Sequence, residues 1–206
     1  MDGSAAAPRT IVFDLGGVLI DWNPRYLYRG LIPDERAMEE FLATVCTGAW
    51  NECQDAGRSI AEAEAELLER HPQHETLIRA YYQGFDRMLA GPIDGTVAIL
   101  DELHARGVPL YALTNWSRET FPHARRRFGF LERFRGIVVS GELGMMKPDA
   151  RIFRHLTETH ALDAKDCLFI DDSPKNVAGA RAAGLHAMQF TGPNSLRTAL
   201  RQYGLL

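Results

Sequence analysis

Polar side chains stand at or just beyond the ends of short apolar runs at several separate places in this sequence. They are Asp14, Thr114, Asn115, Lys147, Asp171 and Asp172. Taken singly, each has an ordinary explanation, since an aspartate often forms a turn after a strand and a lone lysine is usually solvated. Two adjacent aspartates, however, repel each other unless solvent, a cation or a proton offsets their charges. The acidic pair therefore points to a bound cation.

Asp14, Asp171 and Asp172 offer the oxygen ligands that a hard divalent cation prefers. Mg²⁺ usually combines a few protein carboxylates with water and with substrate phosphate, and Lys147 would add a second positive charge. These charges would neutralise a phosphoryl group and leave one carboxylate free to attack it, giving an aspartyl-phosphate that water then hydrolyses. The residue types thus predict phosphoryl transfer.

These residues can meet only if the strands before them end at one edge of a sheet. Short, β-branched or apolar runs predict strands at Thr10–Asp14, Pro109–Thr114, Gly136–Ser140, Cys167–Asp171 and His186–Phe190. Helical spacing appears between them at Thr96–Arg106, Asp149–Thr159 and Asn176–Ala183. The alternation predicts an α/β core with a parallel sheet covered on both faces, and ligands bind such sheets beyond the carboxyl ends of the strands.

The stretch from Asn23 to Leu89 shows no strand run. Amphipathic helices are predicted at Asp34–Cys46, Ser59–Arg70 and His74–Leu89, and Ser59 precedes Glu62 as in a capping box. We divide the chain into a catalytic core of residues 1–21 and 92–206 and an inserted helical cap of residues 22–91, which should lie above the carboxyl ends of the strands. The hinges of the cap are expected at Asp21–Pro24 and Ala90–Gly95, where turn formers occur.

Within the predicted cap, the segment GAWNECQDAGRS (Gly48–Ser59) interrupts the helical pattern with two glycines. One interpretation is a substrate-binding loop in which Trp50 stacks on a sugar and Asn51, Asp55 and Arg58 bind its hydroxyls. The other is a helix connection whose tryptophan fills the interior of the cap. Trp22 and Trp116 leave the same choice open, between walls of a crevice and buried packing.

Composition limits the partners and the compartment. The 206 residues include 23 Lys and Arg against 27 Asp and Glu, a net charge of -4, which provides no basic field for nucleic acid. Apolar runs stay well short of the roughly 18 residues of a spanning helix, and the opening MDGSAAAPR does not resemble a signal peptide. Three widely spaced cysteines predict reduced thiols and no zinc site. We expect a cytoplasmic protein without a membrane partner; oligomeric state stays open.

Four ordered motifs carry a family resemblance: FDLGGV (Phe13–Val18), LTN (Leu113–Asn115), MKP (Met146–Pro148) and IDDSPKN (Ile170–Asn176). In this order and spacing they resemble the haloacid dehalogenase-like hydrolases. The resemblance implies a Rossmann-like parallel-sheet core, and the predicted helical insertion looks like the cap of this family. The segment DLGGVLIDWNP is similar to the branch of sugar-phosphate phosphatases that includes α-glucose-1-phosphate phosphatase.

The resemblance also implies catalytic roles. Asp14 would be the nucleophile, and Thr114 and Asn115 would bind the phosphoryl oxygens. Lys147 would steady Asp14 and the charge of the substrate. The implied activity is hydrolysis of small phosphorylated metabolites, with sugar phosphates favoured.

The same resemblance implies a Mg²⁺ site. Asp171 and Asp172 would be its acidic residues together with Asp14, and Gly16 would contribute a backbone carbonyl. Asp172 is favoured as the direct ligand, with Asp171 either a second ligand or an outer partner.

The sequence departs from the family at Gly16. Most phosphatases of this family have a second aspartate there, which protonates the leaving oxygen and later activates water; such help is worth roughly 10² to 10⁴ in rate. Asp21 and Asp55 are the nearest candidates for a replacement acid. A sugar phosphate joined through its anomeric oxygen has a comparatively acidic leaving group and would suffer least from the loss.

Two other functions stay open. Haloacid dehalogenases also lack the second aspartate and displace halide from carbon without a metal, but Asp171 and Asp172 would then repel a carboxylate substrate. The chain could also be a catalytically weak protein that binds phosphorylated ligands.

Overall fold

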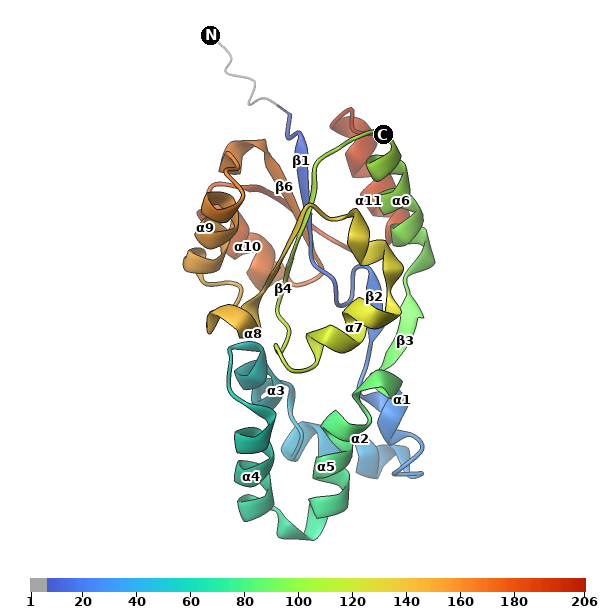
Figure 1. The fold of residues 1–206 in the computed structure, drawn as a ribbon. Coiled ribbons are helices and arrows are strands. Elements are labelled where there is room, and N and C mark those ends of the chain that lie inside the picture. The colour runs from blue at the N-terminus through green and yellow to red at the C-terminus, as the bar shows by residue number, and fades with distance from the viewer. Residues whose placement is uncertain (1–6) are drawn as a thin grey trace.

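The computed structural model describes residues 7–206, which contain a parallel sheet of five strands with helices on both faces (Figure 1). The strand order is β5-β4-β1-β6-β7. The bounds are β1 (Thr10–Phe13), β4 (Leu110–Thr114), β5 (Gly136–Val139), β6 (Cys167–Asp171) and β7 (His186–Gln189). Each predicted strand is present to within one residue at either end, and the predicted α/β fold is confirmed.

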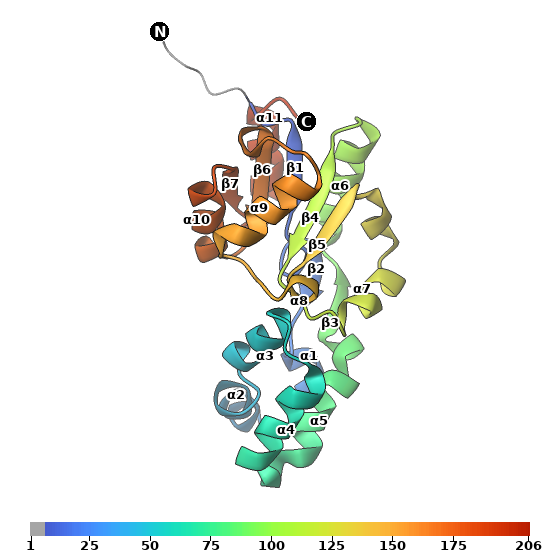
Figure 2. The same ribbon diagram turned by 60° about the vertical axis from the view of Figure 1, so that its left-hand side comes forward.

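Alternate residues of the central strands pack on opposite helical layers, as the two-residue period of a strand requires. Val12 and Phe169 face α9 (Ala150–Thr159) and α10 (Pro174–Ala182), where Phe153 meets Phe169 edge to face. Ile11 and the other inward residues of the opposite face contact α6 (Asp94–Ala105) and α11 (Pro193–Gln202). Figures 1 and 2 show these helix pairs on either side of the sheet.

The insertion after β1 is helical, as predicted, and lies beyond the carboxyl ends of the strands (Figure 2). Its helices are α1 (Arg25–Tyr28), α2 (Glu35–Thr44), α3 (Gly48–Asp55), α4 (Ile60–Arg70) and α5 (Glu75–Gln83). Ser59 and Glu62 form the predicted capping box at the start of α4. The predicted helix His74–Leu89 is shorter than expected, because α5 ends before Gly84 and a 3₁₀ turn, η2 (Phe85–Met88), follows.

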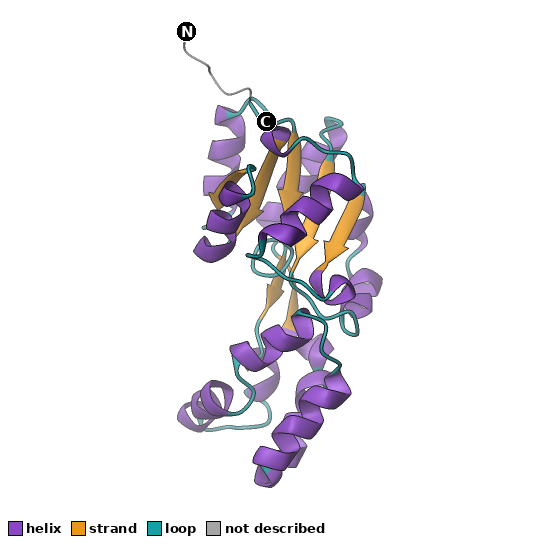
Figure 3. Ribbon diagram, turned by 90° about the vertical axis from the view of Figure 1, so that its left-hand side faces the viewer, coloured by secondary structure: helices purple, strands orange, loops and turns teal. Residues whose placement is uncertain are grey.

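Two short strands that the sequence did not predict flank the stretch from Asn23 to Leu89, and only Leu89 of that stretch lies in one of them. β2 (Ile20–Trp22) pairs antiparallel with β3 (Leu89–Pro92), with Ile20 opposite Pro92 and Asp21 opposite Gly91. The segments predicted as hinges therefore include parts of a two-stranded ribbon, visible between the sheet and the helices of the insertion in Figure 3. Strands of three and four residues are too short to establish a two-residue period in a sequence.

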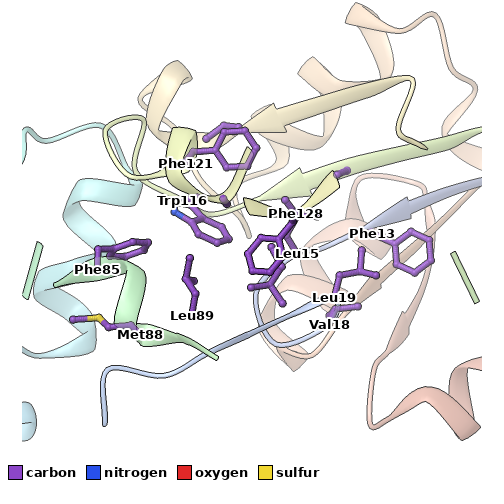
Figure 4. Close-up of a cluster of buried hydrophobic side chains, with 14 of the residues drawn as sticks. Phe13, Leu15, Val18, Leu19, Phe85, Met88, Leu89, Trp116, Phe121 and Phe128 are labelled. Carbon is purple, nitrogen blue, oxygen red and sulfur yellow. The ribbon is translucent and has the colours of Figure 1, made fainter. Parts of the chain in front are cut away.

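Buried apolar side chains join the ribbon to the core (Figure 4). Phe85, Met88 and Leu89 lie in one apolar cluster with Trp116 and with Phe121 at the start of α7 (Phe121–Arg127). Phe85 and Trp116 meet edge to face, with ring centroids 6.1 Å apart. This packing links the base of the insertion to the loop that follows β4.

Within residues 7–206, no helix has the length and apolar character needed to cross a membrane. Residues 1–6, which hold most of the segment that does not resemble a signal peptide, lie outside the described residues. The three cysteines are free, with Cys46 and Cys167 buried and Cys53 exposed.

Candidate active site

Asp14 leaves β1 at the middle of the sheet edge and is largely buried. Its backbone N–H still donates to the Ile170 carbonyl at 2.8 Å. Its Oδ1 accepts from the Leu15 N–H at 2.7 Å and from Lys147 Nζ at 2.9 Å. Among the described residues no hydrogen bond reaches Oδ2, so one oxygen is held while the other is free to react.

Lys147 is fully buried beneath this edge. Its ammonium group lies 2.9 Å from Asp14 Oδ1 and donates to Asp171 Oδ2 at 2.7 Å and to the Leu113 carbonyl at 2.9 Å, which uses all three of its protons. Burial by itself would lower the pKa of Lys147, but the charges of Asp14 and Asp171 outweigh burial and raise it. The lysine therefore remains a cation between two carboxylates.

Asp171 is equally buried and fully occupied. Besides Lys147, it accepts from the Ser173 N–H at 2.8 Å and, on both oxygens, from Asn176 Nδ2 at 3.1 Å. Asn176 has no role in the sequence-based prediction, although it ends the motif IDDSPKN. An amide at the first turn of a helix that follows an acidic pair is the signal that could have identified it.

Asp172 is exposed, in contrast to Asp171. One oxygen each of Asp14, Asp171 and Asp172 lies within 4.8 Å of the others, a spacing at which a divalent cation could be held. Gly17 has φ +72°, and a Cβ there would lie 2.6 Å from Asp172 Oδ2, so the loop needs glycine to let this carboxylate approach. Asp172 is thus the freest carboxylate for direct coordination, and Asp171 suits an outer position.

Burial raises the pKa of Asp14 to about 7 in the metal-free protein, and the nearby charge of Asp171 adds to the rise, while Lys147 and the Leu15 N–H oppose it. Burial and Asp171 likewise raise the pKa of Asp172. A bound dication would favour the charged forms of both. The donor set therefore fits a hard cation such as Mg²⁺.

Thr114 is the last residue of β4 and Asn115 follows it, and their side chains make different hydrogen bonds. Asn115 is committed to the backbone of Lys147, donating through Nδ2 to its carbonyl at 3.0 Å and accepting its N–H on Oδ1 at 2.9 Å. The Thr114 hydroxyl is buried without a hydrogen-bond partner among the described residues. The hydroxyl is therefore available for a ligand oxygen, whereas the amide positions the lysine.

A pocket that is open to solvent lies beside this cluster. Its lining residues come from both core and insertion: Gly16, Trp22, Asn51, Asp55, Phe85, Asn115, Trp116 and Thr120. Sequence reasoning missed Phe85 and Thr120. Phe85 falls in a segment predicted as one amphipathic helix, where an aromatic residue indicates packing and nothing more.

The segment Gly48–Ser59 was predicted as an interruption, and this was wrong: most of it is helix α3. Thr47 caps the helix by accepting the Trp50 N–H at 3.0 Å, Gly48 is its first residue, and Gly57 follows its end with φ +103°. The glycines thus flank the helix. Asn51 and Asp55, one turn apart, both reach the pocket.

Trp50 and Arg58 do not line this pocket, which contradicts their prediction as substrate-binding residues. Trp50 is buried between Tyr81 and Tyr82, and its Nε1 donates to the Ala63 carbonyl at 3.2 Å. Arg58 pairs with Glu66 and donates to Gln54 Oε1 at 2.7 Å. Trp50 thus fills the interior of the helical insertion, which is the alternative weighed for it, and the partly exposed Arg58 pairs within the insertion.

Comparison with known proteins agrees with this geometry. A family model described as haloacid dehalogenase-like hydrolase matches residues 8–184. The chain is 25% identical to the sesquiterpene phosphatase astK of Aspergillus oryzae, over 94% of this chain and 95% of the relative. It is 26% identical to a phosphoglycolate phosphatase of Photobacterium profundum, over 88% and 82% of the two chains.

The fold is also similar to a solved structure. A wild-type HAD family enzyme of Bacteroides thetaiotaomicron, in complex with magnesium and inorganic phosphate, superposes with a TM-score of 0.66 at 22% identity, covering 90% of this chain and 95% of that one. The four motifs, the cluster they form and the match over most of the chain agree: this protein belongs to the haloacid dehalogenase-like hydrolases.

Proposed function

We propose that the protein is a Mg²⁺-dependent phosphatase that hydrolyses small phosphorylated metabolites through an aspartyl-phosphate on Asp14. The observation that carries the proposal is the cluster of Asp14, Lys147, Asp171 and Asp172, in which one buried cation holds the nucleophile and one carboxylate stays exposed for a metal. The relatives named as phosphatases support the same reaction class.

The residues suggest how the reaction would run. Lys147 and the Leu15 N–H hold Asp14 Oδ1, which leaves Oδ2 for attack on phosphorus. The unpaired Thr114 hydroxyl would donate to a phosphoryl oxygen. Asp14 and Asp172 would hold Mg²⁺ with the Gly16 carbonyl, and Asp171 would support them; when bound, the ion neutralises charge on the phosphoryl group.

The acidic cluster weighs against dehalogenation. A haloacid carries a carboxylate, and Asp171 and Asp172 would repel it without a cation. The two activities are separated by assaying phosphate release from phosphate esters and chloride release from a 2-chloroacid, each with Mg²⁺ and with EDTA. We expect phosphate release that chelation abolishes and Mg²⁺ restores; metal-independent chloride release would overturn the proposal.

For the substrate we favour sugar phosphates, with Asn51 as a hydroxyl partner and the indole of Trp22 or Trp116 as a stacking surface. The aromatic walls Trp22, Phe85 and Trp116 also favour a second candidate, an ester with an apolar organic group, and similarity to a sesquiterpene phosphatase supports it. Phosphate release from a sugar 1-phosphate and from an isoprenyl monophosphate at equal concentration distinguishes the two by kcat/KM.

A further inference from the structure

Two features of the pocket are complementary. At Gly16, two residues after the nucleophile, a Cβ would meet nothing within 4 Å, so the position that carries an acid in most phosphatases of the family is empty space. Asp55 lines the same pocket from helix α3 of the insertion. A carboxyl group is therefore present in the pocket, but it comes from a different part of the chain.

The Asp55 side chain is held from within the insertion. Asn51 Nδ2 donates to Asp55 Oδ2 at 3.2 Å, the Tyr82 hydroxyl donates to Asn51 Oδ1 at 3.0 Å, and Gln54 Nε2 donates to that hydroxyl at 2.6 Å. Tyr82 and Gln54 are buried. A relay of buried polar groups thus orients the carboxyl group toward the pocket wall.

The backbone at Asp55 is tied to the core as well. The Ser140 hydroxyl, at the start of α8 (Ser140–Leu143), donates to the Asp55 carbonyl at 2.5 Å. A Cβ at Gly57 would lie 3.2 Å from Gly144 Cα, which shows how closely the two backbones approach. These contacts fix the end of α3 relative to the loop that leads to Lys147.

The pKa of Asp55 suits a group that both gives and takes a proton at neutral pH. Burial raises its pKa to about 7; Glu52 adds to the rise, and the Ser117 amide and Lys147 oppose it. Among the described residues no ion pair involves Asp55, in contrast to Glu52, which pairs with Lys175 at 3.0 Å. Both protonation states of Asp55 are therefore accessible.

We propose that Asp55 is the general acid and base that position 16 does not supply, an inference that rests on the proposed phosphatase function. Asp14 Oδ2 bonds to phosphorus while the bond from phosphorus to the ester oxygen breaks, and the Asp55 carboxyl gives its proton to that leaving oxygen. In the second half, water bonds to phosphorus, Asp55 takes the proton of the water, and the bond from Asp14 to phosphorus breaks. Inorganic phosphate leaves, and both aspartates return to their starting forms.

Asp21, the other acid near the nucleophile, does not fit this role. It lies in β2 and does not line the pocket. Its carboxylate accepts a hydrogen bond from the Tyr26 hydroxyl, whose oxygen is 2.9 and 3.1 Å from the two carboxylate oxygens. Asp21→Asn is therefore the matched control for Asp55→Asn, since each replaces a half-buried carboxylate by its isosteric amide.

The test compares leaving groups in the first turnover, with Mg²⁺ present. p-Nitrophenyl phosphate releases a stable phenolate that needs no proton, whereas a simple alkyl phosphate releases an alkoxide that does. In Asp55→Asn we expect alkyl phosphate cleavage to fall by about 10² to 10⁴, and the initial burst of nitrophenol to change little. Slow turnover should follow the burst, because water attack on the aspartyl-phosphate lacks its base.

Equal losses for both esters in Asp55→Asn, or no loss for either, would overturn the assignment. Asp21→Asn should behave like wild type with both esters. If the wild-type protein releases phosphate from neither ester nor from a sugar phosphate, the proposed function fails instead, so the two failures are distinguishable.

A second variant distinguishes the loss of an acid in Asp55→Asn from damage to the fold. The empty space at Gly16 can accept a side chain, so Gly16→Asp in the wild-type background should fold and offer a second acid. Combined with Asp55→Asn, it should restore alkyl phosphate cleavage at least in part. If the folded double variant still fails to cleave the alkyl phosphate but keeps the nitrophenol burst, this would contradict the proposal that an acid at position 16 can replace Asp55.

Discussion

The acidic residues at the sheet edge and the single pocket carboxylate of the insertion, Asp55, are held in different ways. At the sheet edge, Asp14 and Asp171 share one buried ammonium group and nearby backbone N–H groups. On α3, Asp55 has no ion pair among the described residues and accepts from one side-chain amide. The core carboxylates have a fixed countercharge in Lys147, and a bound dication would keep them ionised, whereas Asp55 has no such countercharge among residues 7–206.

The two sets of carboxylates suit different steps of the proposed reaction, attack on phosphorus and proton transfer. Attack on phosphorus needs a fixed anion and fixed countercharges, which the ends of parallel strands provide. Proton transfer needs a group whose pKa lies near the working pH, which burial without an ion-pair partner provides. The insertion therefore contributes chemistry as well as the walls of the pocket.

The largest effect is expected from removing the shared cation. Lys147→Met leaves Asp14 and Asp171 buried without their countercharge, and breaking a buried ion pair costs about 3–5 kcal/mol of unfolding free energy. Urea denaturation measures this loss, and phosphate release should disappear with it. A loss of less than about 1 kcal/mol, typical of an exposed pair, would show that the cluster is not held by this ion pair.

A smaller functional effect is expected inside the insertion. Trp50 packs against Tyr81 and Tyr82 with ring centroids at 5.1 and 5.4 Å, so Trp50→Ala should lose about 3–5 kcal/mol of stability, as large-to-small core substitutions do. Thermal unfolding checks the stability, and KM should stay near wild type where the variant is folded. Normal stability with a raised KM would move Trp50 into the substrate site.

The smallest effect is expected where the insertion meets α10 at the surface. Lys175 and Glu52 are 3.0 Å apart, but their side chains are 56% and 49% exposed. Lys175→Met should therefore cost about 0–1 kcal/mol, which makes it the matched control for Lys147→Met. A loss in urea denaturation as large as that of Lys147→Met would remove the contrast between buried and exposed pairs.

The sheet edge could be predicted from sequence because its residues occupy fixed positions at strand ends. Once β1, β4 and β6 are parallel neighbours, Asp14, Thr114 and Asp171 must converge. The insertion could not be predicted to the same degree. Its boundary strands are too short to show a period, and α3 places Asn51 and Asp55 in the pocket but Trp50 in the interior through its rotation, which depends on packing against Tyr81 and Tyr82.

The central claim is that Asp14 carries the phosphoryl group during turnover. Acid quenching during turnover of a phosphate ester, in the presence of Mg²⁺, followed by mass spectrometry of the peptide that contains Asp14, tests it directly. The account predicts a phosphoryl group on Asp14, absent in Asp14→Asn, which should also lose turnover. An organic group from the substrate on Asp14, the product of displacement at carbon, or turnover that survives Asp14→Asn, would contradict it.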